Sequence, residues 1–140
     1  MSMHDTIQRY KEDFDLFETG NEKLEYIFEL GKKHTTLPEE LKSDDTFIHG
    51  CSSPAWLVAE CKDGKMILRG EGTSEMAKGM LTLLLDIFSD REPDEILSFD
   101  PKELEQLGIM ELLSPVRQQS MEAFLNKVYS YAKDCKEGKL

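Results

Sequence analysis

The sequence predicts an α/β protein of the α+β type, in which a small antiparallel sheet of about three strands packs against several helices. Two apolar segments, residues 55–62 and 65–70, flank the turn dipeptide Asp63-Gly64 and predict a β-hairpin. Apolar residues at helical spacing occur before this hairpin and again after it. The chain of 140 residues is long enough for one hydrophobic core, so we expect a single domain over residues 1–140.

Acidic side chains dominate the charge of the sequence. Asp and Glu total 28 against 17 Lys and Arg, which gives a formal net charge of −11. A surface of this sign repels phosphate backbones and anionic lipids, so we expect no nucleic-acid partner and no membrane binding. No apolar run approaches the roughly 18 residues of a spanning helix, and the N-terminal segment lacks the features of a signal peptide. We therefore expect a cytoplasmic protein.

Two amphipathic helices are predicted before the hairpin. The first begins near a cap at Asp5 or Thr6 and ends at Gly20. The second begins after a cap at Asn21 and ends at Gly31. The apolar positions that define them are Ile7, Tyr10, Phe14 and Phe17 in the first and Leu24, Ile27, Phe28 and Leu30 in the second.

A polar segment connects these helices to the hairpin. Residues 35–45 are predicted to form a loop, with a helical turn at 39–42. A short third strand near residues 47–49 would complete the sheet. Trp56 lies on the first hairpin strand, and we expect it in the core because such strands need large apolar residues.

Helices dominate the chain after the hairpin. A long apolar helix capped by Thr73 or Ser74 is predicted to reach about Phe88 and to be the central packing helix. Asp100-Pro101 and Ser114-Pro115 each place a capping side chain before a proline at the first helical position. The last long helix is therefore expected to begin near Pro115.

The three cysteines differ in their surroundings. Cys51 lies among turn residues in the stretch FIHGCSSPAW, whereas a structural cysteine usually lies on an apolar face. Cys61 lies in a predicted strand and Cys135 in the C-terminal turn of the last helix, so both are interpreted as structural or incidental. Their odd number and lack of short paired spacing argue against a disulfide framework and a zinc ribbon. At least one thiol should be free.

Three motifs occur in a characteristic order. They are GCSSPAW at residues 50–56, RGEGTSEMAKGM at residues 69–80 and LSPVR at residues 113–117. Their order and spacing, in a chain of this length, resemble the SufE/CsdE family of sulfur acceptors. Members of that family typically show GCQSxVW, a glycine with acidic and small residues before a helix that carries KG, and L[ST]PxR at the start of the final helix. Ser52 stands where glutamine is usual, and Thr73 stands where aspartate is frequent, with Glu71 nearby as a possible substitute.

The resemblance implies a fold and a function. The implied fold is SufE/IscU-like, with a small antiparallel sheet covered on one side by helices. The implied function is to take persulfide sulfur from a cysteine desulfurase of the SufS/CsdA type, to stimulate that enzyme and to pass the sulfur to an iron–sulfur scaffold complex. Pyridoxal phosphate belongs to the partner, so no cofactor is expected here. A monomer or weak dimer is expected.

The resemblance also assigns roles at the cysteine loop. Cys51 is the persulfide carrier, because sulfur transfer needs a thiolate that can reach into a partner's active site. Gly50 and Ser52 provide conformational freedom and hydrogen bonds, and His49 is a candidate general base or environment residue. Arg117 is a cation in the first turn of a helix, where the dipole favours an acid, which indicates a partner contact or site support. We expect Cys51 at rest to be partly or fully buried, with a thiol pKa that is not strongly lowered.

Two other functions are compatible with these residues. His49, Cys51, Cys61 and Cys135 are suitable ligands for a metal ion or an iron–sulfur cluster. Alternatively, the protein is a self-contained thiol peroxidase or redox protein in which Cys51 is oxidised and Cys61 or Cys135 resolves it. Both alternatives require Cys61 or Cys135 to take part in the chemistry.

Overall fold

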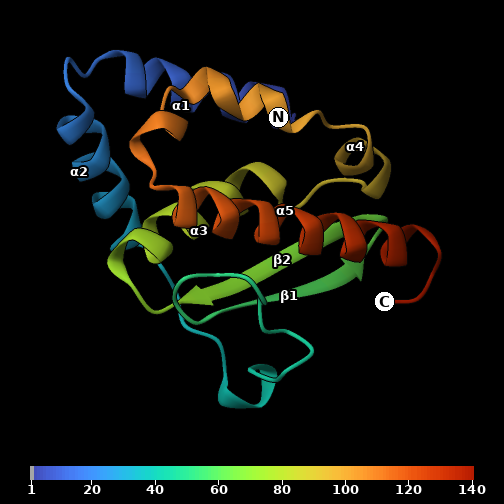
Figure 1. Ribbon diagram of the computed structural model, residues 1–140. Coiled ribbons are helices and arrows are strands. Elements are labelled where there is room, and N and C mark those ends of the chain that lie inside the picture. The colour runs from blue at the N-terminus through green and yellow to red at the C-terminus, as the bar shows by residue number, and fades with distance from the viewer. Residues whose placement is uncertain (1) are drawn as a thin grey trace.

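The structure of the protein is a computed structural model that describes residues 2–140. It has mixed helical and antiparallel β structure, as the sequence predicts (Figure 1). The elements in chain order are α1 (Met3–Asp15), α2 (Gly20–Gly31), η1 (Glu39–Leu41), β1 (Ala55–Lys62), β2 (Lys65–Gly72), α3 (Glu75–Phe88), α4 (Pro93–Leu97), η2 (Pro101–Leu107), η3 (Met110–Leu112) and α5 (Pro115–Lys136), where η denotes a 3-10 helix. None of the described helices is both long and apolar enough to cross a membrane.

The β1–β2 hairpin packs against helices on one face. α3 and α5 lie along it, while the segment from α2 to β1, with η1, projects on the other side (Figure 1). Alanine or a larger residue at Gly79 of α3 would overlap the backbone carbonyl of Ile27, so this glycine allows α2 and α3 to pack closely. The buried side chains form one cluster, which includes Phe14, Ile27, Leu57, Leu83, Phe88, Phe124 and Val128.

The first two helices begin earlier than predicted. Ser2 caps α1, because its hydroxyl accepts a hydrogen bond from the Asp5 amide at 3.1 Å while the Asp5 carboxylate accepts one from the Ser2 amide. Asp5 is thus the third helical residue and completes a capping box. Thr19 caps α2 through the Glu22 amide, which places Gly20 inside α2 and leaves Asn21 without the capping role.

The hairpin is confirmed, with Ala55 paired to Gly72 and Lys62 to Lys65. Asp63 and Gly64 both have positive φ angles, 53° and 79°, as the predicted turn requires. The prediction of a third strand is wrong for the described residues, where the sheet has two strands and Phe47 forms only an isolated bridge to Trp56. A turn ends this pairing on each side, because the Phe47 amide bonds to the Ser43 carbonyl and Gly50 turns the chain away with φ of 100°.

Trp56 is not in the core. Its strand neighbours Ala55 and Leu57 face the helices and are buried, so the alternation of the strand turns Trp56 to the opposite face. There the indole ring packs edge-on against Phe47, and the Lys42 ammonium lies over it at 5.4 Å. The residue type suits a strand, but the pairing register decides which face it occupies.

The helices after the hairpin begin largely where the sequence places them. Ser74 caps α3 through the Ala77 amide at 3.1 Å, and Ser114 caps α5 through the Arg117 amide at 3.3 Å. Asp100 caps the segment that follows it, but this segment is the 3-10 helix η2. It ends at Gly108, which adopts a left-handed conformation.

Cys61 and Cys135 form a disulfide, although the number and spacing of the cysteines argued against a disulfide framework. The expected free thiol is that of Cys51. Their Cα atoms are 5.7 Å apart, within the range that a disulfide can span. The two residues are 74 positions apart in sequence, and only the packing of the end of α5 beside β1 brings them together. Spacing along the chain could not indicate this pair.

Candidate functional site

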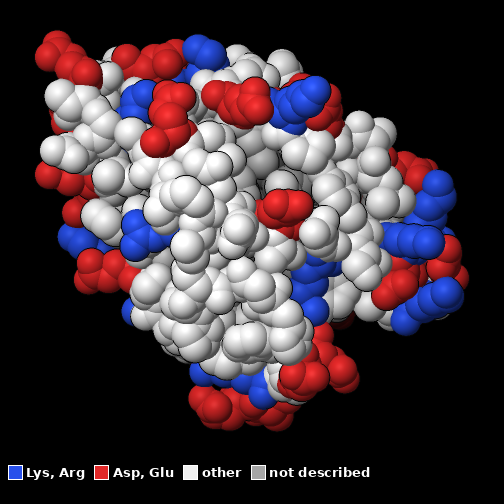
Figure 2. Space-filling view, in the orientation of Figure 1, with Lys and Arg blue, Asp and Glu red and all other residues white. Residues whose placement is uncertain are grey.

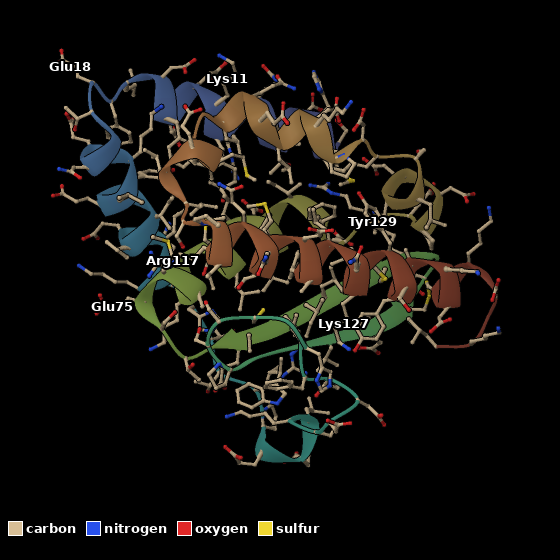
Figure 3. All side chains as sticks on the ribbon, in the orientation of Figure 1. Lys11, Glu18, Glu75, Arg117, Lys127 and Tyr129 are labelled. Atoms are coloured by element: carbon tan, nitrogen blue, oxygen red, sulfur yellow. A yellow bond between two sulfur atoms is a disulfide. The ribbon has the colours of Figure 1, made fainter. Side chains whose placement is uncertain are left out.

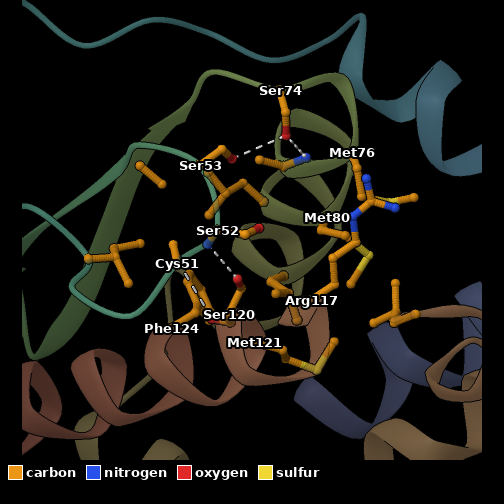
Figure 4. Close-up of a pocket in the computed structure, with 16 residues that line it drawn as sticks. Cys51, Ser52, Ser53, Ser74, Met76, Met80, Arg117, Ser120, Met121 and Phe124 are labelled. Atoms are coloured by element: carbon orange, nitrogen blue, oxygen red, sulfur yellow. Dashed lines mark hydrogen bonds between the residues drawn. The ribbon is translucent and has the colours of Figure 1, made fainter. Parts of the chain in front are cut away.

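A pocket of about 70 Å³ lies between the loop before β1 and the helices α3 and α5 (Figure 4). Most of its lining is apolar. The lining residues are Ile48, Cys51, Ser52, Ser53, Ala55, Ser74, Met76, Ala77, Met80, Leu81, Leu84, Leu113, Arg117, Ser120, Met121 and Phe124. The pocket thus brings the three sequence motifs together in space.

Cys51 closes one side of this pocket. It is half-buried, and its thiol donates a hydrogen bond to the Ser120 carbonyl with a sulfur–oxygen distance of 3.8 Å. The next amide, of Ser52, donates to the Ser120 hydroxyl at 3.0 Å. Burial raises the pKa of the Cys51 thiol above its ordinary value. The resting cysteine is therefore protonated at neutral pH and is a weak nucleophile. The partial burial of Cys51 and the direction of its pKa agree with the expectations from the sequence.

Both ends of the loop lie close to neighbouring elements. Gly50 has φ of 100°, and a Cβ atom there would lie 3.3 Å from the Cβ of Ala123 in α5. At the other end, the Thr73 hydroxyl donates to the Pro54 carbonyl at 3.0 Å, and the Ser53 hydroxyl lies 3.3 Å from that of Ser74. The corner between β2 and α3 therefore anchors the segment that leads into β1.

Arg117 reaches across the pocket from the first turn of α5. Figure 3 shows Arg117 at the start of α5, and in Figure 4 its side chain extends beside Met76 and Met80 of α3. No ion pair joins its guanidinium to a carboxylate within residues 2–140. An unpaired cation at the rim of an apolar pocket can attract an anion that enters or contacts the site.

The surface around this rim has few charged side chains. Figure 2 shows a largely uncharged area over the start of α5 and the loop before β1, while acidic side chains gather toward the edges of the view. Val116 is 53% exposed beside Arg117. An exposed apolar residue next to an unpaired arginine is typical of a protein contact surface.

Two of the predicted site residues lie away from the thiol. His49 is exposed, and its Nε2 atom lies 3.4 Å from the Asp44 carboxylate, so it does not act as a base for Cys51 in this conformation. Glu71 is buried. Its carboxylate accepts a hydrogen bond from the Leu37 amide at 2.7 Å and forms an ion pair with the Lys42 ammonium at 2.8 Å. The hydrogen bond from Lys42 is the main reason that the pKa of Glu71 is lowered.

Ser120, Ser74 and Met76 belong to the site but were not expected there, and the contact of Ser53 with Ser74 was not expected either. Ser120 had a detectable signal, because it lies three residues after Arg117 and therefore on the same face of the helix. The hydroxyls of Ser53 and Ser74 gave no such signal, since their proximity depends on how α3 approaches the loop.

No group of three or more His, Cys, Asp or Glu side chains in the described part of the chain is arranged to hold a metal ion. Of the four ligands considered for a metal or cluster, Cys61 and Cys135 are bonded to each other. The same bond engages both candidate resolving cysteines of a peroxidase. Cys51 is the free cysteine of the structure.

Comparison with known proteins gives consistent results. The family described as "SufE: Fe-S metabolism associated domain" matches residues 8–132. An uncharacterised SufE-like protein of Rhizobium meliloti (strain 1021) is 27% identical over 134 residues, which cover 92% of this chain and 93% of that protein. The solution structure of a hypothetical protein from Thermus thermophilus has the same fold, with a TM-score of 0.78 at 19% identity over 94% of this chain and 96% of the other.

Proposed function

The chain belongs to the SufE family of Fe–S metabolism associated domains, and from this premise we propose that it is a sulfur carrier whose Cys51 accepts persulfide sulfur. The donor is a pyridoxal-phosphate-dependent cysteine desulfurase of the SufS/CsdA type, which the protein stimulates. The sulfur then passes to an iron–sulfur scaffold complex. The observation that supports this proposal is the position of a free cysteine on a loop that closes over an apolar pocket.

The transfer step needs no external oxidant or reductant. The Cys51 thiolate attacks the outer sulfur of the donor persulfide, a new sulfur–sulfur bond forms, and the donor cysteine leaves as a thiolate. Cys51 then carries the persulfide. Delivery repeats the exchange, with an acceptor thiolate attacking the outer sulfur and Cys51 leaving as the thiolate.

The pocket suits the resting and loaded states. A volume of about 70 Å³ is several times the roughly 10–15 Å³ that a cavity needs on this measure to hold one water molecule, so it accommodates one additional sulfur atom. Its apolar lining disfavours the charged thiolate of Cys51. It also disfavours the entry of soluble thiols, which would reduce the persulfide. Transfer therefore takes place with Cys51 turned outward, where the thiolate forms more readily.

The neighbouring residues have supporting roles in this proposal. Arg117 binds an acidic group of the desulfurase or stabilises the developing sulfur anion. His49, exposed on the approach to the loop, contacts the partner. Gly50 and Ser52 allow the loop to move, Thr73 anchors its far end, and Glu71 holds the adjoining segment through Lys42.

The proposed location is the cytoplasm, with the protein acting as a monomer or weak dimer that holds no cofactor. Cellular thiols in that compartment reduce most disulfides. The redox state of Cys61 and Cys135, measured by alkylation of both residues in rapidly quenched cells, tests this part of the proposal. A fully oxidised pair would indicate a protected bond or a more oxidising compartment.

Mass spectrometry after incubation with a desulfurase and cysteine tests the main proposal. We expect the intact protein to gain the mass of one sulfur atom, located on the peptide that contains Cys51 and removed by a reducing agent. The C51S variant should gain none while the desulfurase keeps its basal activity. Sulfur accepted by C51S would refute the assignment.

A further inference from the structure

The tip of the cysteine loop is hydrogen-bonded to one residue of α5. The carbonyl of Ser120 accepts a hydrogen bond from the Cys51 thiol at 3.8 Å. The hydroxyl of Ser120 accepts one from the Ser52 amide at 3.0 Å. Within the described chain these are the hydrogen bonds that Cys51 and Ser52 make. Both hydrogen bonds of the tip therefore go to a single residue.

The Ser120 hydroxyl is itself oriented by the helix. It donates its hydrogen to the Val116 carbonyl, four residues earlier, at 3.2 Å. Because the hydrogen is engaged there, a lone pair of the hydroxyl is available to the Ser52 amide. This arrangement gives the side chain a defined rotamer, so its contact with the loop is directional.

We propose that Ser120 is a positioning residue that latches the Cys51 loop over the pocket in the shielded state. This inference rests on the proposed sulfur-carrier function for its purpose, although the latch itself is a property of the free protein. When the loop turns outward, both contacts with Ser120 break, while the hydrogen bonds that join Pro54 to Thr73 and Ser53 to Ser74 can remain. Opening therefore involves the tip and leaves its base in place.

Replacing Ser120 with alanine removes the contact with the Ser52 amide but keeps the carbonyl and the helix. A hydrogen bond of this kind makes a net contribution that corresponds to roughly a 2- to 12-fold change in an equilibrium. The open population of the loop should rise by that factor. The rate at which a bulky maleimide labels Cys51 should rise with it, because labelling requires the open loop.

Three controls make the measurement specific. S130A makes the same substitution on an exposed part of the same helix, about 15 Å away. S120T retains a hydroxyl that can bond the carbonyl four residues earlier, so it should restore the slow rate. C51S gives the background, and omitting reductant keeps Cys61 and Cys135 in their disulfide.

We expect S120A to label roughly 2- to 12-fold faster than the unmodified protein, with S120T and S130A close to the unmodified rate and with all three variants still folded, as a cooperative thermal transition would show. An S120A rate equal to that of the unmodified protein overturns the latch. Equal acceleration in S120A and S130A, or in S120A and S120T, also overturns it, since the hydroxyl is then not responsible. No desulfurase is present, so failure of this test is distinct from failure of sulfur transfer.

Discussion

The disulfide between Cys61 and Cys135 should supply a large part of the stability of the protein. It closes a loop of 74 residues between β1 and the end of α5. The chain-entropy relation for a loop of this length gives a stabilisation of about 4 kcal/mol at 25 °C, because the bond restricts the unfolded chain. Total stabilities of small domains are about 5–15 kcal/mol, so the loss should be easy to detect.

Urea unfolding followed by circular dichroism measures this contribution. We expect the double variant C61S/C135S to lose about 4 kcal/mol of unfolding free energy relative to the oxidised protein. Addition of a reducing agent should have a similar effect on the unmodified protein and no effect on the double variant. C51S provides the matched control, because it removes a thiol outside the disulfide and should leave the response to reductant unchanged.

The entropic origin of this stability is refuted if reductant shifts the unfolding free energy of the unmodified protein by less than about 1 kcal/mol although both thiols become reactive. That result would mean that the unfolded chain is already restricted in this region or that the packing of α5 on β1 supplies the same restraint. A response of the same size in C61S/C135S would assign the effect to Cys51 instead.

Three further outcomes follow from the site. R117A should change the unfolding free energy by less than about 1 kcal/mol, as for most surface positions, yet weaken desulfurase activation. A loss of activation that is explained by a loss of folding would contradict a partner role. The pKa of Glu71 is lowered in the folded protein, where its carboxylate pairs with Lys42. The ion pair therefore stabilises the protein fully above pH 4.5, the ordinary pKa of a glutamate carboxyl. This stability is lost as the pH falls through the folded pKa. E71Q should therefore be less stable than the unmodified protein at neutral pH and no less stable in acid, and a constant difference across this range would refute the linkage. The rate at which Cys51 is labelled should rise with pH, with a midpoint above the pKa of a free cysteine thiol, because burial raises the pKa of Cys51. A midpoint below the pKa of a free thiol would exclude the apolar shield.

Local chemistry made several elements predictable. The Asp63-Gly64 turn set the register of the hairpin, and the Ser114-Pro115 pair marked the first residue of α5. The glycine and serines around Cys51 indicated a loop, and its apolar neighbours indicated a shield. In each case the residues that carry the signal are adjacent in sequence.

The features that were missed depend on contacts between distant segments. Trp56 was assigned to the core from its residue type, but the pairing of β1 with β2 places it on the opposite face. The partner of Cys61 lies 74 residues away, so a count of cysteines could not identify it. The hydrogen bond between the Ser52 amide and the Ser120 hydroxyl spans 68 residues, and only the path of α5 beside the loop brings the two together.

The positions of these contacts indicate which part of the molecule would move in the proposed transfer. Near the C-terminal end of α5, the Cys61–Cys135 disulfide joins this helix to β1. About one turn earlier in α5, the Tyr131 hydroxyl donates a hydrogen bond to the Leu57 carbonyl of β1 at 2.7 Å. The first turns of the same helix supply Arg117 and Ser120 to the pocket. Since α5 is fixed to the strand that the cysteine loop leads into, the helix and the strand form a rigid frame. Shielding and exposure of Cys51 can then alternate through the few residues between Gly50, with its positive φ, and Pro54, held by Thr73, without disturbing the core.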